Sequence, residues 1–226
     1  NCNSLKQITI PSSVTSIEKK AFFDCKSLMQ FAIPSSLKSF GDLAFCWCRS
    51  LTTITIPPTV KSIASYAFRY CQSLTQITIP PSVVSIGESA FDGCDSLTQI
   101  TIPSSVISIG ECAFTECSRL EKIIVDSKNP NFVSIDDVLF TKDIRTLIRY
   151  ASFNKRTKYA VPLSVTSISK YAFSFCSSLA QITIPSSMTS IEQFSFADCR
   201  SLTQITIPSS VTSIGPYAFW HCRSLA

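Results

Sequence analysis

The sequence predicts a solenoid, a stack of similar coils built mainly from short parallel β-strands. Leucine recurs with a period of 23, at positions 5, 28, 51, 74, 97 and 120, and again at 179, 202 and 225. Nearly the same residues follow each leucine: LTQITIPPSVVSIG at 74–87, LTQITIPSSVISIG at 97–110 and LTQITIPSSVTSIG at 202–215. A fixed period of this length indicates a repeat architecture, in which each repeat is one structural unit.

Each repeat predicts two short strands and a turn. In residues 74–80, the apolar Leu74, Ile77 and Ile79 lie between polar residues, as in a strand with one buried face, and Pro80 ends the strand. The segment V-x-S-I predicts a second extended piece, and A-F-x-x-C predicts a short helical turn that directs Phe and Cys inward. One coil cannot bury its apolar side alone, so stacking on similar coils stabilises the array.

One repeat departs from the period. The segment LEKIIVDSKNPNFVSIDDVLF at 120–140 fits a repeat with three extra residues, with Phe140 in the phenylalanine position, and the next repeat runs from Arg156. Residues 1–226 are therefore expected to form a single repeat array that is cut mid-repeat at both ends. Within it, residues 126–156 are expected to form an irregular coil with a β-hairpin insertion.

The pattern LxxIxIPxxVxxIGxxAFxxC resembles the BspA-like, or Treponema-type, leucine-rich repeat over essentially the whole chain. The segment NPNFVSIDDVLFTKDIRTLIRYA at 129–151 also resembles a hairpin-bearing variant repeat of that family. The resemblance implies a leucine-rich repeat solenoid. It also implies a microbial or protist cell-surface adhesin that contacts host proteins such as fibronectin. A scaffold does not define a function, so the function depends on the individual residues that the scaffold presents.

Composition excludes several classes of protein. Hydrophobic residues make up 45% of the 226 residues and charged residues 15%, which is too apolar for a disordered chain. The net charge of +5 is small for a nucleic-acid binder, so no nucleic-acid partner is expected. No stretch approaches 18 consecutive apolar residues, so no membrane span is expected in this chain.

The cysteines predict a structural ladder. Nine of the 11 occur once per repeat in one column, so their spacing follows the coil and not a metal-binding motif. We therefore expect buried free thiols that act as small hydrophobes, in preference to a metal site or a disulfide framework. Cys46, outside this column, is expected to be the most exposed and reactive thiol. No metal and no cofactor are expected.

No residue pattern predicts catalysis, so the chain is not expected to be an enzyme. One serine recurs in every repeat, and these hydroxyls are expected to bond the backbone of the next coil. The column is Ser16, Ser39, Ser62, Ser85, Ser108, Ser134, Ser167, Ser190 and Ser213. The single histidine, His221, is expected in a solvent-exposed turn, and glycine-rich phosphate loops are lacking.

The outward face of the first strands is a row of glutamine and threonine, including Gln76, Thr78, Gln99 and Thr101. One interpretation is that threonine simply suits strands. The other is a contact surface for a protein or a glycan. An ice-binding surface is not favoured, because the T-x-T pair occurs only at Thr53 and Thr55.

Two further features predict partner contacts. Aromatic residues such as Trp47 and Tyr70 occupy the turns, and aromatic side chains are favoured at protein interfaces. The irregular segment carries an excess of basic residues, which suits an acidic partner or an ordinary solvated hairpin. Its candidate contact residues are Lys142, Arg145, Arg149, Lys155 and Arg156.

The sequence thus predicts a non-catalytic protein-binding repeat domain. The hypothesis is a cell-surface or secreted adhesin that contacts extracellular-matrix or host surface proteins. The alternative is an intracellular, cytoplasmic scaffold that presents the same repeat surface to protein partners. The residues predict no oligomeric state.

Overall fold

The computed structural model describes residues 2–226, which form two compact units. Unit 1 contains residues 2–120 and Ile124–Asn131, and unit 2 contains Glu121–Ile123 and Phe132–Ala226. Each unit is a stack of coils with short strands. The single continuous array over residues 1–226 stays a prediction.

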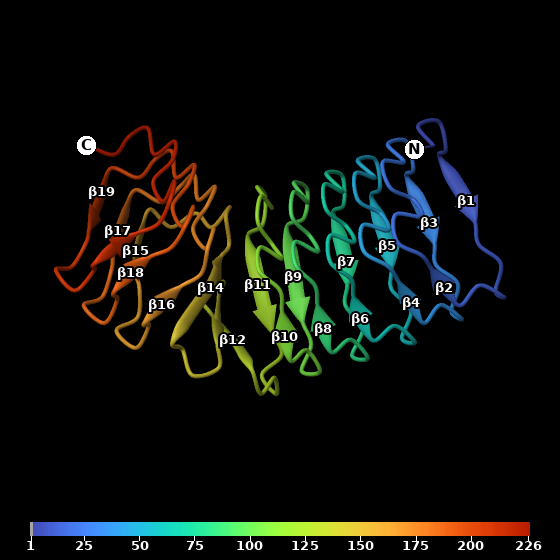
Figure 1. Ribbon diagram of the computed structural model, residues 1–226, viewed down its shortest axis with the longest axis horizontal. Coiled ribbons are helices and arrows are strands. Elements are labelled where there is room, and N and C mark those ends of the chain that lie inside the picture. Colours follow the sequence, from blue (N-terminus) through green and yellow to red (C-terminus); the bar gives the residue numbers. More distant parts are fainter. Residues whose placement is uncertain (1) are drawn as a thin grey trace. The chain divides into compact units, whose positions relative to one another are not determined.

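Unit 1 is built from parallel strands that follow the period of the sequence. The first strands of successive coils lie side by side (Figure 1). Their register pairs Gln7 with Gln30, and Ile54 with Ile77, which confirms the predicted period and the parallel sheets. One sheet contains β1 (Gln7–Thr9), β3 (Gln30–Ala32), β5 (Thr53–Thr55) and β7 (Gln76–Thr78). The second strands are β2 (Ser16–Ile17) with β4 (Ser39–Phe40), and β6 (Ser62–Ile63) with β8 (Ser85–Ile86) and β10 (Ser108–Ile109).

The border between the units falls inside a strand. Strand β9 (Gln99–Ile102) belongs to unit 1, whereas β11 (Lys122–Val125) begins in unit 2 and its last two residues belong to unit 1.

Unit 2 combines parallel coils with an antiparallel hairpin. Strands β12 (Phe132–Ile135), β13 (Val138–Thr141) and β14 (Thr146–Tyr150) are antiparallel, and β14 then pairs in parallel with β16 (Ser167–Ile168). These antiparallel strands lie within the segment for which the sequence predicts a hairpin. The remaining strands are β15 (Lys158–Ala160) with β17 (Gln181–Thr183) and β19 (Gln204–Thr206), and β18 (Ser190–Ile191) with β20 (Ser213–Ile214).

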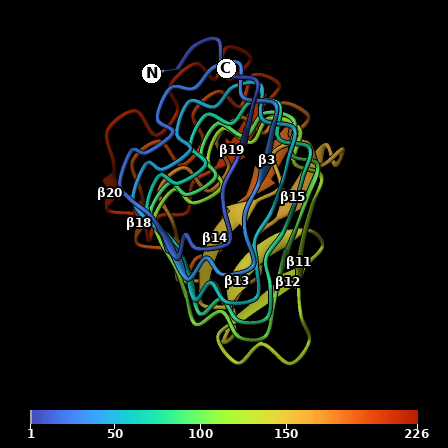
Figure 2. The same cartoon turned by 90° about the vertical axis from the view of Figure 1, so that its right-hand side faces the viewer.

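Each unit has a stack of aromatic rings in its core. In Figure 2 the coils of residues 2–120 overlie one another. The phenylalanines of these coils form one column. Successive rings are parallel within 7°, with centroids 5.5–5.8 Å apart, at Phe22, Phe45, Phe68, Phe91 and Phe114. In unit 2 the Phe173 ring stacks on Phe196 at 5.2 Å, and the Tyr150 ring lies 5.3 Å from Phe173 with a tilt of 32°. The sequence assigned the phenylalanine position of this region to Phe140. That residue instead lies in β13, because the hairpin makes β14 the strand beside β16.

The predicted short helical turns are wrong: residues 2–226 contain no helix. The segment A-F-x-x-C forms overlapping four-residue turns instead. Ala21 N–H donates to Glu18 O at 3.1 Å within the coil, whereas Phe22 N–H donates to Ala44 O of the next coil at 2.8 Å. Alternate N–H groups thus bond along the stack, which a helix would prevent because it uses every N–H internally.

This turn places residues in the left-handed region of backbone space. Lys20 and Asp24 have φ of 61° and 59°, and the equivalent positions of the other coils are similar. For most residues other than glycine, this conformation costs about 1–2 kcal/mol relative to the right-handed one. Residues with a branched Cβ are destabilised more. Consistently, in the described regular coils these positions hold no Val, Ile or Thr. They do hold Tyr66, Trp47 and Tyr70, so the backbone itself fixes where these aromatic side chains leave the coil.

Candidate binding surfaces

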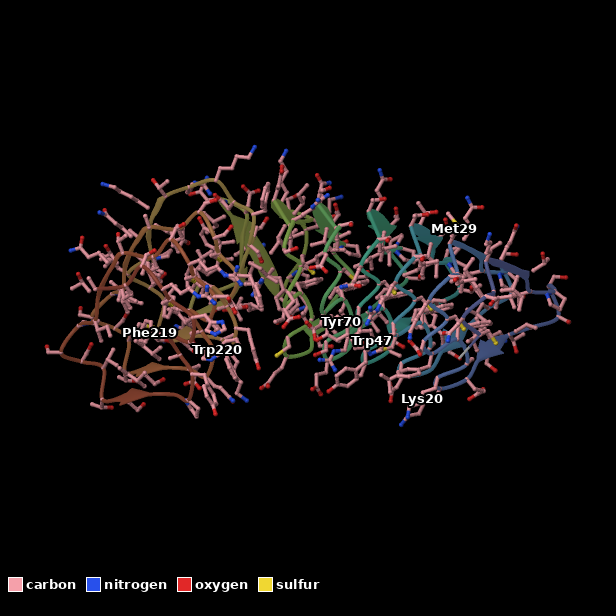
Figure 3. All side chains as sticks on the ribbon, turned by 90° about the horizontal axis from the view of Figure 1, so that it is seen from above. Lys20, Met29, Trp47, Tyr70, Phe219 and Trp220 are labelled. Carbon is pink, nitrogen blue, oxygen red and sulfur yellow. The ribbon has the colours of Figure 1, made fainter. Side chains whose placement is uncertain are left out.

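Trp47 and Tyr70 lie together on the turn surface of unit 1, where Figure 3 shows them side by side. Their ring centroids are 4.2 Å apart. Gly93, one coil further along, has φ of 72°, and a Cβ built on it would lie 2.2 Å from the Tyr70 ring. Glycine therefore lets Tyr70 lie flat against the backbone of the next coil, beneath Trp47.

Arginines complete this group. The Arg49 guanidinium lies 4.6 Å from the Trp47 ring, and that of Arg69 lies 4.8 Å from the Tyr70 ring and 5.6 Å from the Tyr66 ring. Such cation–π contacts hold an arginine in one orientation. We call Trp47, Arg49, Tyr66, Arg69 and Tyr70 the aromatic–arginine cluster.

Carboxylates of the next coil hold two side chains of the cluster in place. Arg69 Nε donates to Asp92 Oδ2 at 2.8 Å, and the Asp92 side chain is 7% exposed. The Tyr66 hydroxyl donates to Glu88, and this hydrogen bond raises the pKa of Tyr66 to about 12. Burial raises the pKa of Tyr70, and Glu116 adds to this effect. Both phenols therefore stay neutral donors at physiological pH.

The sequence identified only part of this cluster. It predicted aromatic contact residues in the turns, Trp47 and Tyr70 among them, but it missed Arg49, Arg69 and the supporting Gly93. A usable signal was present, because Gly93 occurs one period after Tyr70, in a position that most repeats fill with a side chain.

The predicted glutamine and threonine row lies on the outward face of the first strands of the coils. Gln76 and Thr78 are exposed on β7, and Gln99 and Thr101 are exposed on β9. A hollow of about 320 Å³ opens further along this face, at Ala32. It is lined by Gln7, Gln30, Phe31, Ala32, Thr53, Ile54 and Thr55.

The hairpin of unit 2 forms a second hollow, of about 430 Å³, lined by two of the predicted basic residues. Asp136 and Asp137 form the β12–β13 turn with φ of 57° and 65°, as a type I′ turn requires. Arg156 donates to Asp136 O at 2.6 Å and to Asp136 Oδ1 at 3.1 Å. The lining residues are Glu121, Lys122, Asp137, Phe153, Asn154, Lys155 and Arg156. Its three basic side chains are balanced by three acidic ones, Glu121, Asp137 and the neighbouring Asp136. The hollow therefore has no net charge to attract an acidic partner.

The other predicted basic residues are not gathered at this hollow. Lys142 and Arg145 are exposed in the β13–β14 turn. Arg149 is only 3% exposed, so its guanidinium cannot contact a partner on the surface. It donates to Ser174 Oγ at 2.9 Å and to Ser174 O at 3.2 Å, and it also contacts Tyr171 O and Ser152 Oγ. Arg149 therefore has a structural position inside unit 2.

The thiol column is buried and free, as predicted, apart from the exposed Cys2 and the half-buried Cys222. Six of these thiols donate to a phenylalanine carbonyl of the preceding coil, for example Cys71 Sγ to Phe45 O at 3.2 Å. Cys176 instead lies 3.9 Å from Ser174 O. The prediction for Cys46 is wrong, because this thiol is 1% exposed and burial raises its pKa to about 11. The position of Cys46 in the turn directs its thiol into the interior, where neighbouring coils cover it.

The predicted role of the recurring serines is also corrected. The column that includes Ser16 and Ser190 lies on outward strand positions, where both of these hydroxyls donate to glutamates. A different column bonds the preceding coil: Ser82 donates to Val60 O, and Ser105 to Val83 O, each at 2.7 Å. These serines follow the turn proline, where the backbone brings the hydroxyl toward that carbonyl.

His221 is exposed in a turn, as predicted. Its ring stacks on Trp220 with centroids 3.6 Å apart, and Nδ1 lies 3.5 Å from Asp198 Oδ1. Across residues 2–226, no three His, Cys, Asp or Glu side chains gather as metal ligands would. The described chain also contains no helix of the length and apolarity that a membrane crossing needs.

Comparison with protein families identifies the class. The family described as the BspA type Leucine rich repeat region matches in 6 copies, over residues 1–121, 38–155 and 146–226. The chain belongs to this family. A search of the curated proteins finds no match.

Solved structures share this fold. The pneumococcal vaccine antigen PcpA superimposes with a TM-score of 0.87 at 28% identity, covering 97% of this chain and 60% of that chain. A leucine rich cell surface protein from Faecalibacterium prausnitzii A2-165 has a TM-score of 0.78 and 34% identity, covering 99% of this chain and 73% of that chain. A leucine-rich repeat protein from Eubacterium ventriosum has a TM-score of 0.74 and 26% identity, covering 97% of this chain and 58% of that chain. The chain thus spans less than two thirds of the pneumococcal antigen's length.

Proposed function

We propose that this chain is a non-catalytic protein-binding domain of a microbial cell-surface protein, an adhesin that contacts host or matrix proteins. The observation that carries the proposal is the aromatic–arginine cluster, in which Trp47 and Tyr70 lie 4.2 Å apart between two stacked arginines. Trp, Tyr and Arg dominate the binding energy of protein interfaces.

The cluster is ordered before any partner arrives. Arg69 is held by Asp92, Tyr66 by Glu88, and Tyr70 by its contact with the backbone at Gly93. A partner would therefore lose little side-chain entropy on this side of the interface. Pre-ordered aromatic and arginine side chains favour a contact role over a solvated surface.

The relatives support the location of this activity. One is named as a cell surface protein and another as a vaccine antigen, and both superimpose over nearly the whole chain. The buried free thiols are compatible with the alternative, a cytoplasmic scaffold, and equally with an exported protein whose core excludes oxidants.

Binding to immobilised matrix proteins tests the cluster. Fibronectin, fibrinogen, laminin and collagen would be coated separately, and binding of the full chain would be measured by surface plasmon resonance. Trp47→Ala combined with Tyr70→Ala is expected to weaken binding about 100-fold, the usual effect of removing two central interface residues.

A matched control is Tyr217→Ala. Tyr217 has the same backbone conformation as Tyr66, in a turn of unit 2, and it is 61% exposed. It is expected to leave binding to the coated proteins within about twofold, as for residues outside a binding centre. Equal losses in the control and the double variant, or no binding to any coated protein, would contradict the proposal.

A further inference from the structure

The outward face of the first strands of the coils in unit 1, β1, β3, β5, β7 and β9, carries neutral polar groups without partners. Nine glutamine and threonine side chains lie exposed there, and within residues 2–226 none of them makes a side-chain hydrogen bond or an ion pair. They are Gln7, Thr9, Gln30, Thr53, Thr55, Gln76, Thr78, Gln99 and Thr101. Other hydroxyls of this unit behave differently, since Ser36, Ser82 and Ser105 donate to carbonyls of the preceding coil. The face therefore has unused donors and acceptors but no charge.

One residue interrupts this face. Ala32 occupies the position that threonine fills at Thr9, Thr55, Thr78 and Thr101. Its small side chain leaves the hollow of about 320 Å³ between neighbouring strands. The floor contains Phe31 and Ile54, which are 4% and 5% exposed. The rim is formed by the amides of Gln7 and Gln30 and the hydroxyls of Thr53 and Thr55.

We propose that this hollow, which we call the Ala32 notch, binds one sugar residue of an uncharged oligosaccharide. A sugar presents closely spaced hydroxyl groups, each a donor and an acceptor. Glutamine offers two donors and one acceptor, and threonine offers both kinds. The adjacent glutamines and threonines repeat at the spacing of parallel strands, about 4.8 Å, and would contact the neighbouring sugars.

The same features argue against other ligands. A charged ligand would find no opposite charge in the lining of the notch. An extended peptide usually binds by adding a strand to a sheet edge, whereas the notch opens on the face of β1, β3 and β5, whose register already pairs Gln7, Gln30 and Thr53. Figure 3 places Met29, the residue before β3, on the opposite edge of unit 1 from Trp47 and Tyr70. The notch is thus separate from the aromatic–arginine cluster and does not depend on the function proposed for it.

The test uses the full chain and an array of uncharged, sialylated and sulfated oligosaccharides. Binding is expected on uncharged spots, and the strongest of these sugars would then be titrated by calorimetry. Ala32→Thr fills the notch with the residue that the repeat itself uses, so folding should be unaffected. It is expected to weaken binding about tenfold or more, through loss of one or two net hydrogen bonds.

Thr183→Ala is the matched control, because Thr183 is an exposed threonine in the same column of the repeat but lies in β17 of unit 2. It is expected to change affinity by less than about twofold, as for a residue outside the binding site. Three outcomes would overturn the proposal: no bound spot, binding to sialylated or sulfated sugars alone, or equal affinity of wild type and Ala32→Thr.

Discussion

The regular coils of unit 1 and the hairpin region of unit 2 satisfy their polar groups with different kinds of hydrogen bond. In the regular coils, alternate N–H groups of the turn and most thiols of the column donate to carbonyls of a neighbouring coil, as Phe45 N–H does to Ala67 O at 2.9 Å. The hairpin region does not follow this repeating hydrogen-bond pattern. There the guanidinium of Arg149 satisfies carbonyls and hydroxyls of the next coil, and Arg156 and Asn154 bond the turn at Asp136.

This difference shows what repetition provides. A regular coil needs no special residue, because its neighbour presents the matching group, and stability is shared along the stack. An irregular coil depends on single polar side chains, and each of these is expected to be sensitive to substitution. Substitutions in the two regions therefore separate these two modes of stabilisation.

Alkaline pH should have the largest effect, and it acts on the regular coils, which hold all the cysteines. Burial raises the pKa of Cys46 to about 11 and of Cys48 to about 12, and it also raises those of Cys71 and Cys94, from an unfolded value of 9.0. Below pH 9 the thiols are neutral in both states. Above it the unfolded chain loses protons first, so the free energy of unfolding falls by about 1.4 kcal/mol per pH unit for each such thiol.

Urea midpoints at pH 8, 9 and 10, in a reducing buffer, measure this slope. Cys71→Ala removes one thiol, so its midpoint should fall less steeply than that of the wild type. A midpoint that stays constant over this range would show that the thiols are not held neutral in the core.

In the regular column, Phe68→Ala should destabilise unit 1 by about 3–5 kcal/mol, the cost of a large cavity in a packed core. Phe68 is fully buried between Phe45 and Phe91, with centroids 5.6 Å away on both sides. Chemical denaturation followed by circular dichroism would show it. A loss below about 1 kcal/mol would mean that the coils relax into the space, against the close packing expected of protein cores.

In the irregular region, Arg149→Met should cost about 2–4 kcal/mol, because it leaves the carbonyl and hydroxyl groups around Ser174 buried without a donor. Arg145→Met is the matched control, since Arg145 is exposed in the β13–β14 turn. It should change stability by less than about 0.5 kcal/mol, as surface substitutions do. Equal effects of the two, measured by denaturation, would contradict a supporting role for Arg149.

The smallest effect is expected at Gly93. Gly93→Ala places a Cβ at φ of 72° and 2.2 Å from the Tyr70 ring, so it should cost about 1–2 kcal/mol and displace that ring. Quenching of Trp47 fluorescence by its neighbour Tyr70 should change in parallel. Unchanged stability and emission would show that Tyr70 does not rest on this glycine.

The fold was predictable from the sequence because its period is explicit, and the thiol column followed from the same period. The conformation of the turn was not predictable. The spacing of the apolar residues in A-F-x-x-C fits a helix as well as it fits overlapping turns. Trp47 and Tyr70 were recognised by type, but their partners come from neighbouring coils that are distant in the sequence, as Gly93 does for Tyr70. The burial of Arg149 and Cys46 depends on how neighbouring coils cover them, which one repeat does not reveal.

Surface display on intact cells tests most directly the proposal that this is an adhesin domain. An antibody to the chain would be applied to producing cells before and after permeabilisation, with mild protease shaving as a control. We expect signal on unpermeabilised cells, and we expect shaving to remove it. Signal that appears only after permeabilisation would contradict the adhesin and would make the aromatic–arginine cluster the contact surface of an internal scaffold.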